Sequence, residues 1–152
     1  MEQQAQALTE FIEEVLKVNE VAQVDLVAHS MGGLICRLAL AKHGLAGKVG
    51  TLVTMGTPHQ GTYPARYANT ELTRALRPDS SFIRRLNETP PPPDTRFVCL
   101  WSRNDLFVLP PESGILPGSE SVEVTPMTHY SYLLDPEAWN AVRRGLEGLS
   151  AN

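Results

Sequence analysis

The chain has 152 residues, of which 42% are hydrophobic and 20% are charged, and this composition predicts one soluble globular domain over residues 1–152. The net charge of -4 excludes the basic surface expected of a nucleic-acid-binding protein, and no apolar run approaches the roughly 18 residues of a transmembrane helix. The polar start Glu2-Gln3-Gln4 is not a signal peptide and favours a cytoplasmic location, although a trimmed secreted chain would look the same.

The first third of the chain predicts a helix, a strand, a second helix and a second strand. An apolar stripe at helical spacing marks the first helix, which we expect to lie on a sheet, with inward residues Leu8, Phe11, Ile12, Val15 and Leu16. The run Val24–Ala28 is typical of a strand covered on both faces, a helix follows to about His43, and Val49–Met55 is the next buried strand. This spacing predicts parallel strands joined by a right-handed crossover.

The turn between the first strand and its helix has the residues of a nucleophile elbow, Ala28-His29-Ser30-Met31-Gly32-Gly33. Such a turn raises a serine hydroxyl above the sheet, and the N–H of Met31 at the start of the helix would stabilise an oxyanion. We expect Gly32 to let the helix pack close to the strand and Gly33 to add room. Ala28 replaces the usual first glycine with another small residue.

Residues 62–95 predict a cap-like insertion that covers a binding cleft. Two short helices are expected, over Glu71–Arg77 and Ser80–Asn87, with Asp79 or Ser80 as the cap of the second. Their inward residues would be Leu72, Leu76, Phe82, Ile83 and Leu86.

The last third predicts two more strands and a closing helix. Phe97–Trp101 is a buried strand that leads to Asp105, and Val122–Val124 is a short strand that leads to His129. The final helix would run from Pro136 to about Leu149, with Ala138, Trp139, Val142 and Leu146 on its buried side.

Ser30, Asp105 and His129 therefore each follow a strand at the same edge of one parallel sheet, in the order Ser, Asp, His. A hydroxyl becomes a good nucleophile when a neutral imidazole accepts its proton, and a carboxylate orients that imidazole. Glu112 is the alternative acid and His59 the alternative base. The other histidines have structural explanations: His29 cannot easily turn toward Ser30, and His43 ends a helix.

These motifs, together with Val-Thr-Met-Gly-Thr-Pro-His-Gln-Gly-Thr at 53–62, resemble bacterial lipases and esterases of the α/β-hydrolase superfamily. The resemblance implies a parallel sheet of about four strands flanked by helices, and ester hydrolysis through an acyl-enzyme. Ser30 would be the nucleophile, His129 the base and then the acid, Asp105 its orienting carboxylate, and Met31 an oxyanion donor. The expected substrate is a small hydrophobic ester in an apolar cleft lined by Leu106, Phe107, Val108 and Ile115, with no metal and no cofactor.

Similar hydrolases begin with further strands, and a loop after one of them supplies a second oxyanion N–H. The sequence therefore predicts a form that is N-terminally truncated relative to the family, with the Val24–Ala28 strand bare on one edge. Three explanations are open: a minimal hydrolase that forms a homodimer over this edge, a fragment, or a catalytically weak or silent assembly module. Loss of one oxyanion donor typically costs about 10²–10³ in turnover, so weak activity is compatible with an intact triad. A thioesterase or an acyltransferase is a further alternative.

Overall fold

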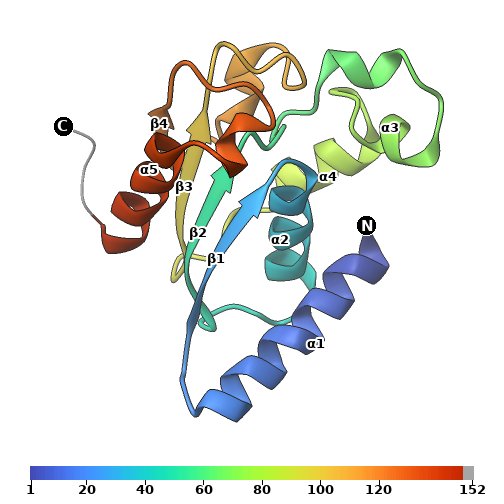
Figure 1. Ribbon diagram of the computed structural model, residues 1–152. Coiled ribbons are helices and arrows are strands. Elements are labelled where there is room, and N and C mark those ends of the chain that lie inside the picture. The colour runs from blue at the N-terminus through green and yellow to red at the C-terminus, as the bar shows by residue number, and fades with distance from the viewer. Residues whose placement is uncertain (149–152) are drawn as a thin grey trace.

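The computed structural model describes residues 1–148, which form a four-stranded parallel sheet with helices on both faces (Figure 1). The strands lie side by side in chain order, β1 (Val24–His29), β2 (Val49–Met55), β3 (Arg96–Trp101) and β4 (Glu120–Glu123). All three pairings are parallel, so the carboxyl ends of the four strands share one edge of the sheet. The fold is thus the expected one, and it places the loops that carry Ser30, Asp105 and His129 at that edge.

The helices divide into two layers because consecutive residues of a buried strand face opposite sides. Leu52 of β2 packs in the core that β1–β3 share with α1 (Glu2–Asn19), α2 (Met31–Lys42) and α4 (Ser81–Glu88). Its neighbour Val53 packs in the second core, against α5 (Pro136–Glu147). The short helix α3 (Glu71–Ala75) precedes α4. Within residues 1–148, no helix has the length and apolar character needed to span a membrane.

Local sequence signals account for the ends of several elements. Ser80 caps α4, and its hydroxyl accepts a hydrogen bond from the Ile83 N–H at 3.1 Å. Of the two predicted caps, Asp79 and Ser80, the second is confirmed. Asp135 caps α5, Pro136 occupies its first turn, and Gly148 closes it with φ 71°. The expected end near Leu149 lies outside the described residues.

Three predicted core residues are exposed instead. Phe11 is 63% exposed, Trp139 45% and Leu72 44%. The first helix was expected to lie on the sheet, but α1 packs mainly against α2. Because a helix covers less of its surface than a sheet would, the buried residues of α1 are Ala5, Ile12 and Leu16. Periodicity identifies an apolar face, whereas the width of the buried part depends on the partner element.

β1 lies at one edge of the sheet, paired on one side with β2. The prediction that this strand is covered on both faces is wrong for the described chain, because Val27 is 39% exposed and Val24 and Leu26 are only partly buried. A strand with this composition normally has neighbours on both sides.

Candidate functional site

The nucleophile candidate Ser30 occupies the turn between β1 and α2. It has φ 55° and ψ −129°, a left-handed backbone conformation that is costly for a residue with a side chain. The Ser30 N–H donates to the Met55 carbonyl, and the Thr57 hydroxyl donates to the Ser30 carbonyl at 2.7 Å. These two bonds from the end of β2 hold the strained turn, as a nucleophile elbow requires.

The prediction that Gly33 provides room is confirmed, whereas the prediction that Gly32 permits the close approach of the helix is wrong. A Cβ on Gly33 would lie 2.3 Å from Thr57 Oγ1 and 2.9 Å from Thr54 Cγ2, so this position has no space for a side chain. A Cβ on Gly32 would meet Ala28 Cβ at 3.7 Å, an ordinary contact. Gly33, not Gly32, therefore permits the close approach of α2 to the sheet.

Asp105 follows β3, in a loop that fixes its carboxylate. Oδ1 accepts hydrogen bonds from the backbone N–H groups of Phe107 at 2.8 Å and Val108 at 3.2 Å. Oδ2 lies 2.9 Å from His129 Nδ1, and the side chain is 1% exposed. A carboxylate held in this way orients an imidazole whose Nδ1 bears the hydrogen.

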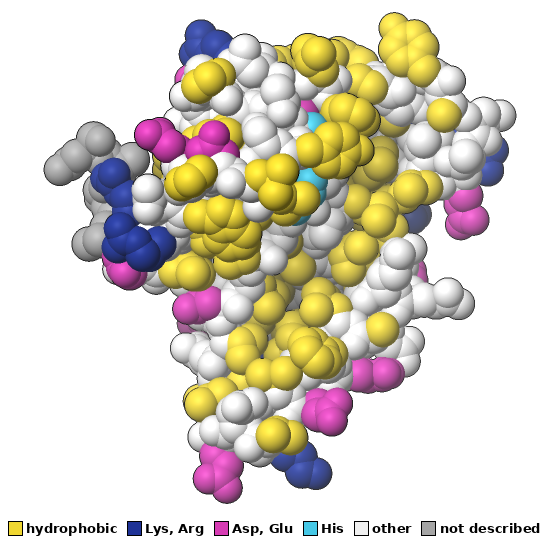
Figure 2. All heavy atoms as spheres, in the orientation of Figure 1, with side chains coloured by type: hydrophobic (Ala, Val, Ile, Leu, Met, Phe, Trp, Pro, Cys, Tyr) yellow, Lys and Arg dark blue, Asp and Glu magenta, His cyan; other side chains and the backbone are white. Residues whose placement is uncertain are grey.

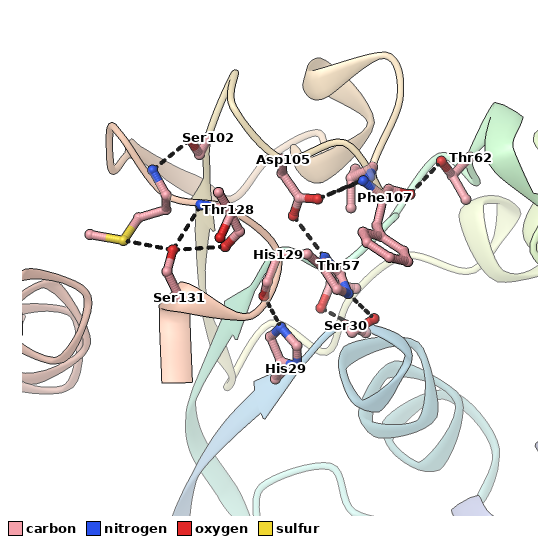
Figure 3. Close-up of polar contacts among 12 residues, drawn as sticks. His29, Ser30, Thr57, Thr62, Ser102, Asp105, Phe107, Thr128, His129 and Ser131 are labelled. Carbon is pink, nitrogen blue, oxygen red and sulfur yellow. Dashed lines mark hydrogen bonds and ion pairs between the residues drawn. The ribbon is translucent and has the colours of Figure 1, made fainter. Parts of the chain in front are cut away.

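His129 lies in the loop after β4 and completes a chain of hydrogen bonds (Figure 3). Its Nε2 is 2.9 Å from Ser30 Oγ, at hydrogen-bond distance for transfer of the hydroxyl proton. The Phe107 ring stacks on the imidazole with centroids 4.8 Å apart, and Tyr130 meets it edge-on at 5.4 Å. These rings shield the imidazole, which is only 6% exposed. The structure thus brings together the three residues that the sequence proposed.

The alternative residues lie elsewhere. Glu112 is in the short 3-10 helix Pro111–Gly114, whereas Asp105 occupies the position beside His129 Nδ1. His59 is fully buried beneath the site, with Nε2 3.0 Å from Thr54 Oγ1 and Nδ1 3.4 Å from an Arg37 nitrogen. Burial, and secondarily the charge of Arg37, keeps the pKa of His59 well below its usual range. His59 is therefore a neutral core residue.

The predicted substrate-lining residues differ in accessibility. Leu106 and Phe107 are 73% and 52% exposed, Ile115 is half-buried, and Val108 is 2% exposed. Val108 reaches the site through its backbone N–H, which holds Asp105. Figure 2 shows hydrophobic side chains gathered around the histidine at this end of the molecule.

Sequence reasoning missed a groove of about 830 Å³ that lies beside Met31. Its lining includes Leu72, Ala75 and Phe82 of the insertion, together with Gln3 at the start of α1. Leu72, which was predicted to be buried, is exposed and lines this groove. Residues of α3 and α4 line this groove, and the expectation that residues 62–95 cover a binding cleft stays a prediction.

Met31 is the first residue of α2, where a helix leaves backbone N–H groups without intrahelical partners. The positive end of the helix dipole lies at the same place. An oxyanion that forms on a carbonyl attacked by Ser30 would develop beside these groups. The local arrangement is suited to acyl transfer.

Comparison with known proteins agrees with this geometry. A family model described as a PGAP1-like alpha/beta domain matches residues 1–75. A GPI inositol-deacylase of Candida albicans is 28% identical over 111 residues, which cover 73% of this chain and 23% of that protein.

Several solved structures, two of them named as lipases, have the same fold. The lipase of Bacillus licheniformis in its propeptide form superposes with a TM-score of 0.82 at 18% identity, over 98% of this chain and 41% of that one. Lipase B of Aspergillus fumigatus gives a TM-score of 0.78 at 19% identity, over 94% of this chain and 41% of its own. The product of the lin2722 gene of Listeria innocua gives a TM-score of 0.72 at 17% identity, over 99% of this chain and 68% of that one.

The chain thus spans less than half the length of the deacylase and of both lipases. By these superpositions, the chain has the α/β-hydrolase fold.

Proposed function

We propose that the protein is a serine hydrolase that cleaves carboxylic esters of hydrophobic acyl groups through an acyl-enzyme. The observation that carries the proposal is the hydrogen-bonded chain from Ser30 through His129 to Asp105 beneath a strained elbow. The deacylase and lipase names of the similar proteins support the same class of reaction.

In the first half-reaction, His129 Nε2 removes the proton of the Ser30 hydroxyl as Oγ attacks the carbonyl carbon of the ester. The C=O electrons move to the carbonyl oxygen, which the Met31 N–H and the start of α2 stabilise. The tetrahedral intermediate then collapses, the bond to the alcohol oxygen breaks, and this oxygen takes the proton from His129. The Ser30 ester remains.

In the second half-reaction, a water molecule gives its proton to His129 and attacks the acyl-enzyme. Collapse of the new tetrahedral intermediate returns the proton to Ser30 Oγ and releases the carboxylic acid. Asp105 stays ionised and stabilises the imidazolium at each stage. The exposed Leu106 and Phe107 side chains, with Ile115 and the buried Val108 behind them, form the proposed apolar side of the site.

A fluorophosphonate probe tests the proposal, because it reacts only with an activated serine. We expect labelling of the wild type and its loss in Ser30→Ala, with hydrolysis of a chromogenic butyrate ester lost in parallel. A well-folded wild type that is neither labelled nor active would contradict the proposal and favour a catalytically silent assembly module. Thioester hydrolysis, or transfer to an added alcohol at rates above ester hydrolysis, would instead favour a thioesterase or an acyltransferase.

We also propose that the protein forms a homodimer over the edge of β1. Val27 of β1 is 39% exposed, and Phe11 of α1 is 63% exposed. An open parallel edge with such side chains is prone to association. Light scattering at micromolar concentration should give twice the monomer mass, and Val27→Lys should give the monomer. A stable wild-type monomer would contradict this proposal.

A further inference from the structure

His29 directly precedes Ser30 in the sequence and contacts His129, the proposed base. The hydrogen bond to the Ser30 hydroxyl comes from His129. The Nε2 of His29 lies 2.7 Å from the backbone carbonyl oxygen of His129, and the two imidazole centroids are 4.7 Å apart (Figure 3). A carbonyl oxygen only accepts hydrogen bonds, so His29 Nε2 must carry the hydrogen. The contact therefore specifies one tautomer of His29.

The loop that carries His129 is anchored at several points. It runs from the end of β4 to the short 3-10 helix Ser131–Leu133. Its start is held by the Met127 N–H, which donates to Ser102 Oγ at 3.2 Å, and its end by Thr128 and Ser131, which hydrogen-bond each other. The bond from His29 joins the backbone of His129 itself to the strand that ends at the nucleophile, across 100 positions of sequence.

We infer that His29 is a positioning residue, whose Nε2–H holds the His129 backbone at the distance from Ser30 that proton transfer requires. The inference rests on the proposed function of Ser30 and His129. The hydrogen bond joins His29, the neighbour of Ser30, to His129 itself. A shift of the loop would therefore change the 2.9 Å distance between His129 Nε2 and Ser30 Oγ directly. A displacement of about 1 Å in such a pair can cost about 10²-fold in rate.

The neutral form of His29 suits this role. Burial lowers the pKa of His29, and this effect outweighs the hydrogen bond to the His129 carbonyl, which raises it. The charged and titratable groups around the ring are His129, which disfavours a second positive charge, Asp105, which favours one, and the rings of Tyr130 and Tyr132. A neutral His29 donates its hydrogen bond without opposing the imidazolium that His129 becomes during the reaction.

Three substitutions separate the hydrogen bond from the bulk of the ring. His29→Gln places an amide N–H at the same number of bonds from Cβ as Nε2. His29→Asn carries the same amide one bond short, and His29→Phe keeps a ring with no donor. We expect kcat for a butyrate ester to fall about 10²-fold in His29→Phe and His29→Asn, with little change in KM. His29→Gln should restore most of kcat.

The distribution of these effects decides the inference. Wild-type kcat in folded His29→Phe, or a His29→Gln variant as slow as His29→Asn, would overturn it while leaving the proposed function intact. An inactive wild type that no fluorophosphonate labels would count against the proposed function instead.

The tautomer gives a test that needs neither activity nor a variant. Nitrogen NMR of the imidazoles in the wild-type protein at neutral pH should show His29 with its hydrogen on Nε2. A hydrogen on Nδ1 with an unprotonated Nε2 would remove the donor and overturn the inference, even if the variants fail to fold.

Discussion

Gly56 lies directly after β2, and its lack of a side chain leaves room for Asp105 and His129. Its φ is +54°, and a Cβ at this position would lie 2.8 Å from Asp105 Oδ2, 2.9 Å from Tyr132 Cε2 and 3.4 Å from His129 Nδ1. Gly56→Ala would therefore press a methyl group against the hydrogen bond between Asp105 and His129. Tyr132 is fully buried and cannot withdraw into solvent.

The cost of Gly56→Ala has two parts. A left-handed conformation costs a residue with a Cβ about 1–2 kcal/mol, and overpacking a filled site costs about 1–3 kcal/mol. We expect the free energy of unfolding to fall by about 2–5 kcal/mol in total. If the carboxylate is displaced from Nδ1, kcat should also fall by about 10²-fold or more, because the imidazole loses its orienting partner.

Gly44→Ala is the matched control. Gly44 has φ +74°, and no atom lies within 4 Å of the position of its Cβ, so this variant carries the backbone cost alone. Urea unfolding followed by tryptophan fluorescence and hydrolysis of a butyrate ester would be measured for both variants. The reasoning is refuted if Gly56→Ala is destabilised no more than Gly44→Ala and keeps its activity.

Three further predictions concern the core beneath the site. Gly33→Ala should lower the free energy of unfolding by about 1–3 kcal/mol, because the methyl group would meet Thr57 Oγ1, whereas Gly32→Ala should change it by less than about 1 kcal/mol in the same urea titration. Burial raises the pKa of Cys36 to about 11. Iodoacetamide at neutral pH should therefore modify Cys36 in the urea-unfolded protein but not in the native protein, as measured by mass spectrometry. Equal rates of modification would contradict this. His59 becomes protonated below about pH 6.5 in the unfolded chain, whereas the fold keeps it neutral. The free energy of unfolding should therefore fall as the pH decreases below that value, by up to about 1.4 kcal/mol per pH unit relative to His59→Gln. Parallel pH curves for the two proteins would argue against this.

The sequence predicts the strands and the residues of the proposed triad because both depend on local signals. The runs that became β2 and β3 are apolar on both faces, and each is short and ends at turn residues. Parallel strands share their carboxyl edge, so Ser30, Asp105 and His129 could be placed together without coordinates. The residues around them have no such signal, because Phe107 and Tyr130 reach the imidazole through loop conformations that no periodicity encodes.

The errors arise where a residue's environment depends on its partner element. Val27 reads as buried from its neighbours in sequence, yet it lies on an edge strand. The role of Gly32 was predicted wrongly because the distance from α2 to Thr57, 24 positions after Gly33, decides which of the two glycines is crowded. The groove beside Met31 combines the start of α1 with α3 and α4, segments whose proximity no motif records.

The strands of this sheet are added in chain order, and the residues of the proposed triad follow three different strands. Ser30 follows β1 and therefore leaves the ribosome before His129, which follows β4. Until His129 has been made, Ser30 lacks the base that the proposed mechanism requires. Cleavage by a protease between β3 and His129 would again separate Ser30 from that base if the severed part dissociates.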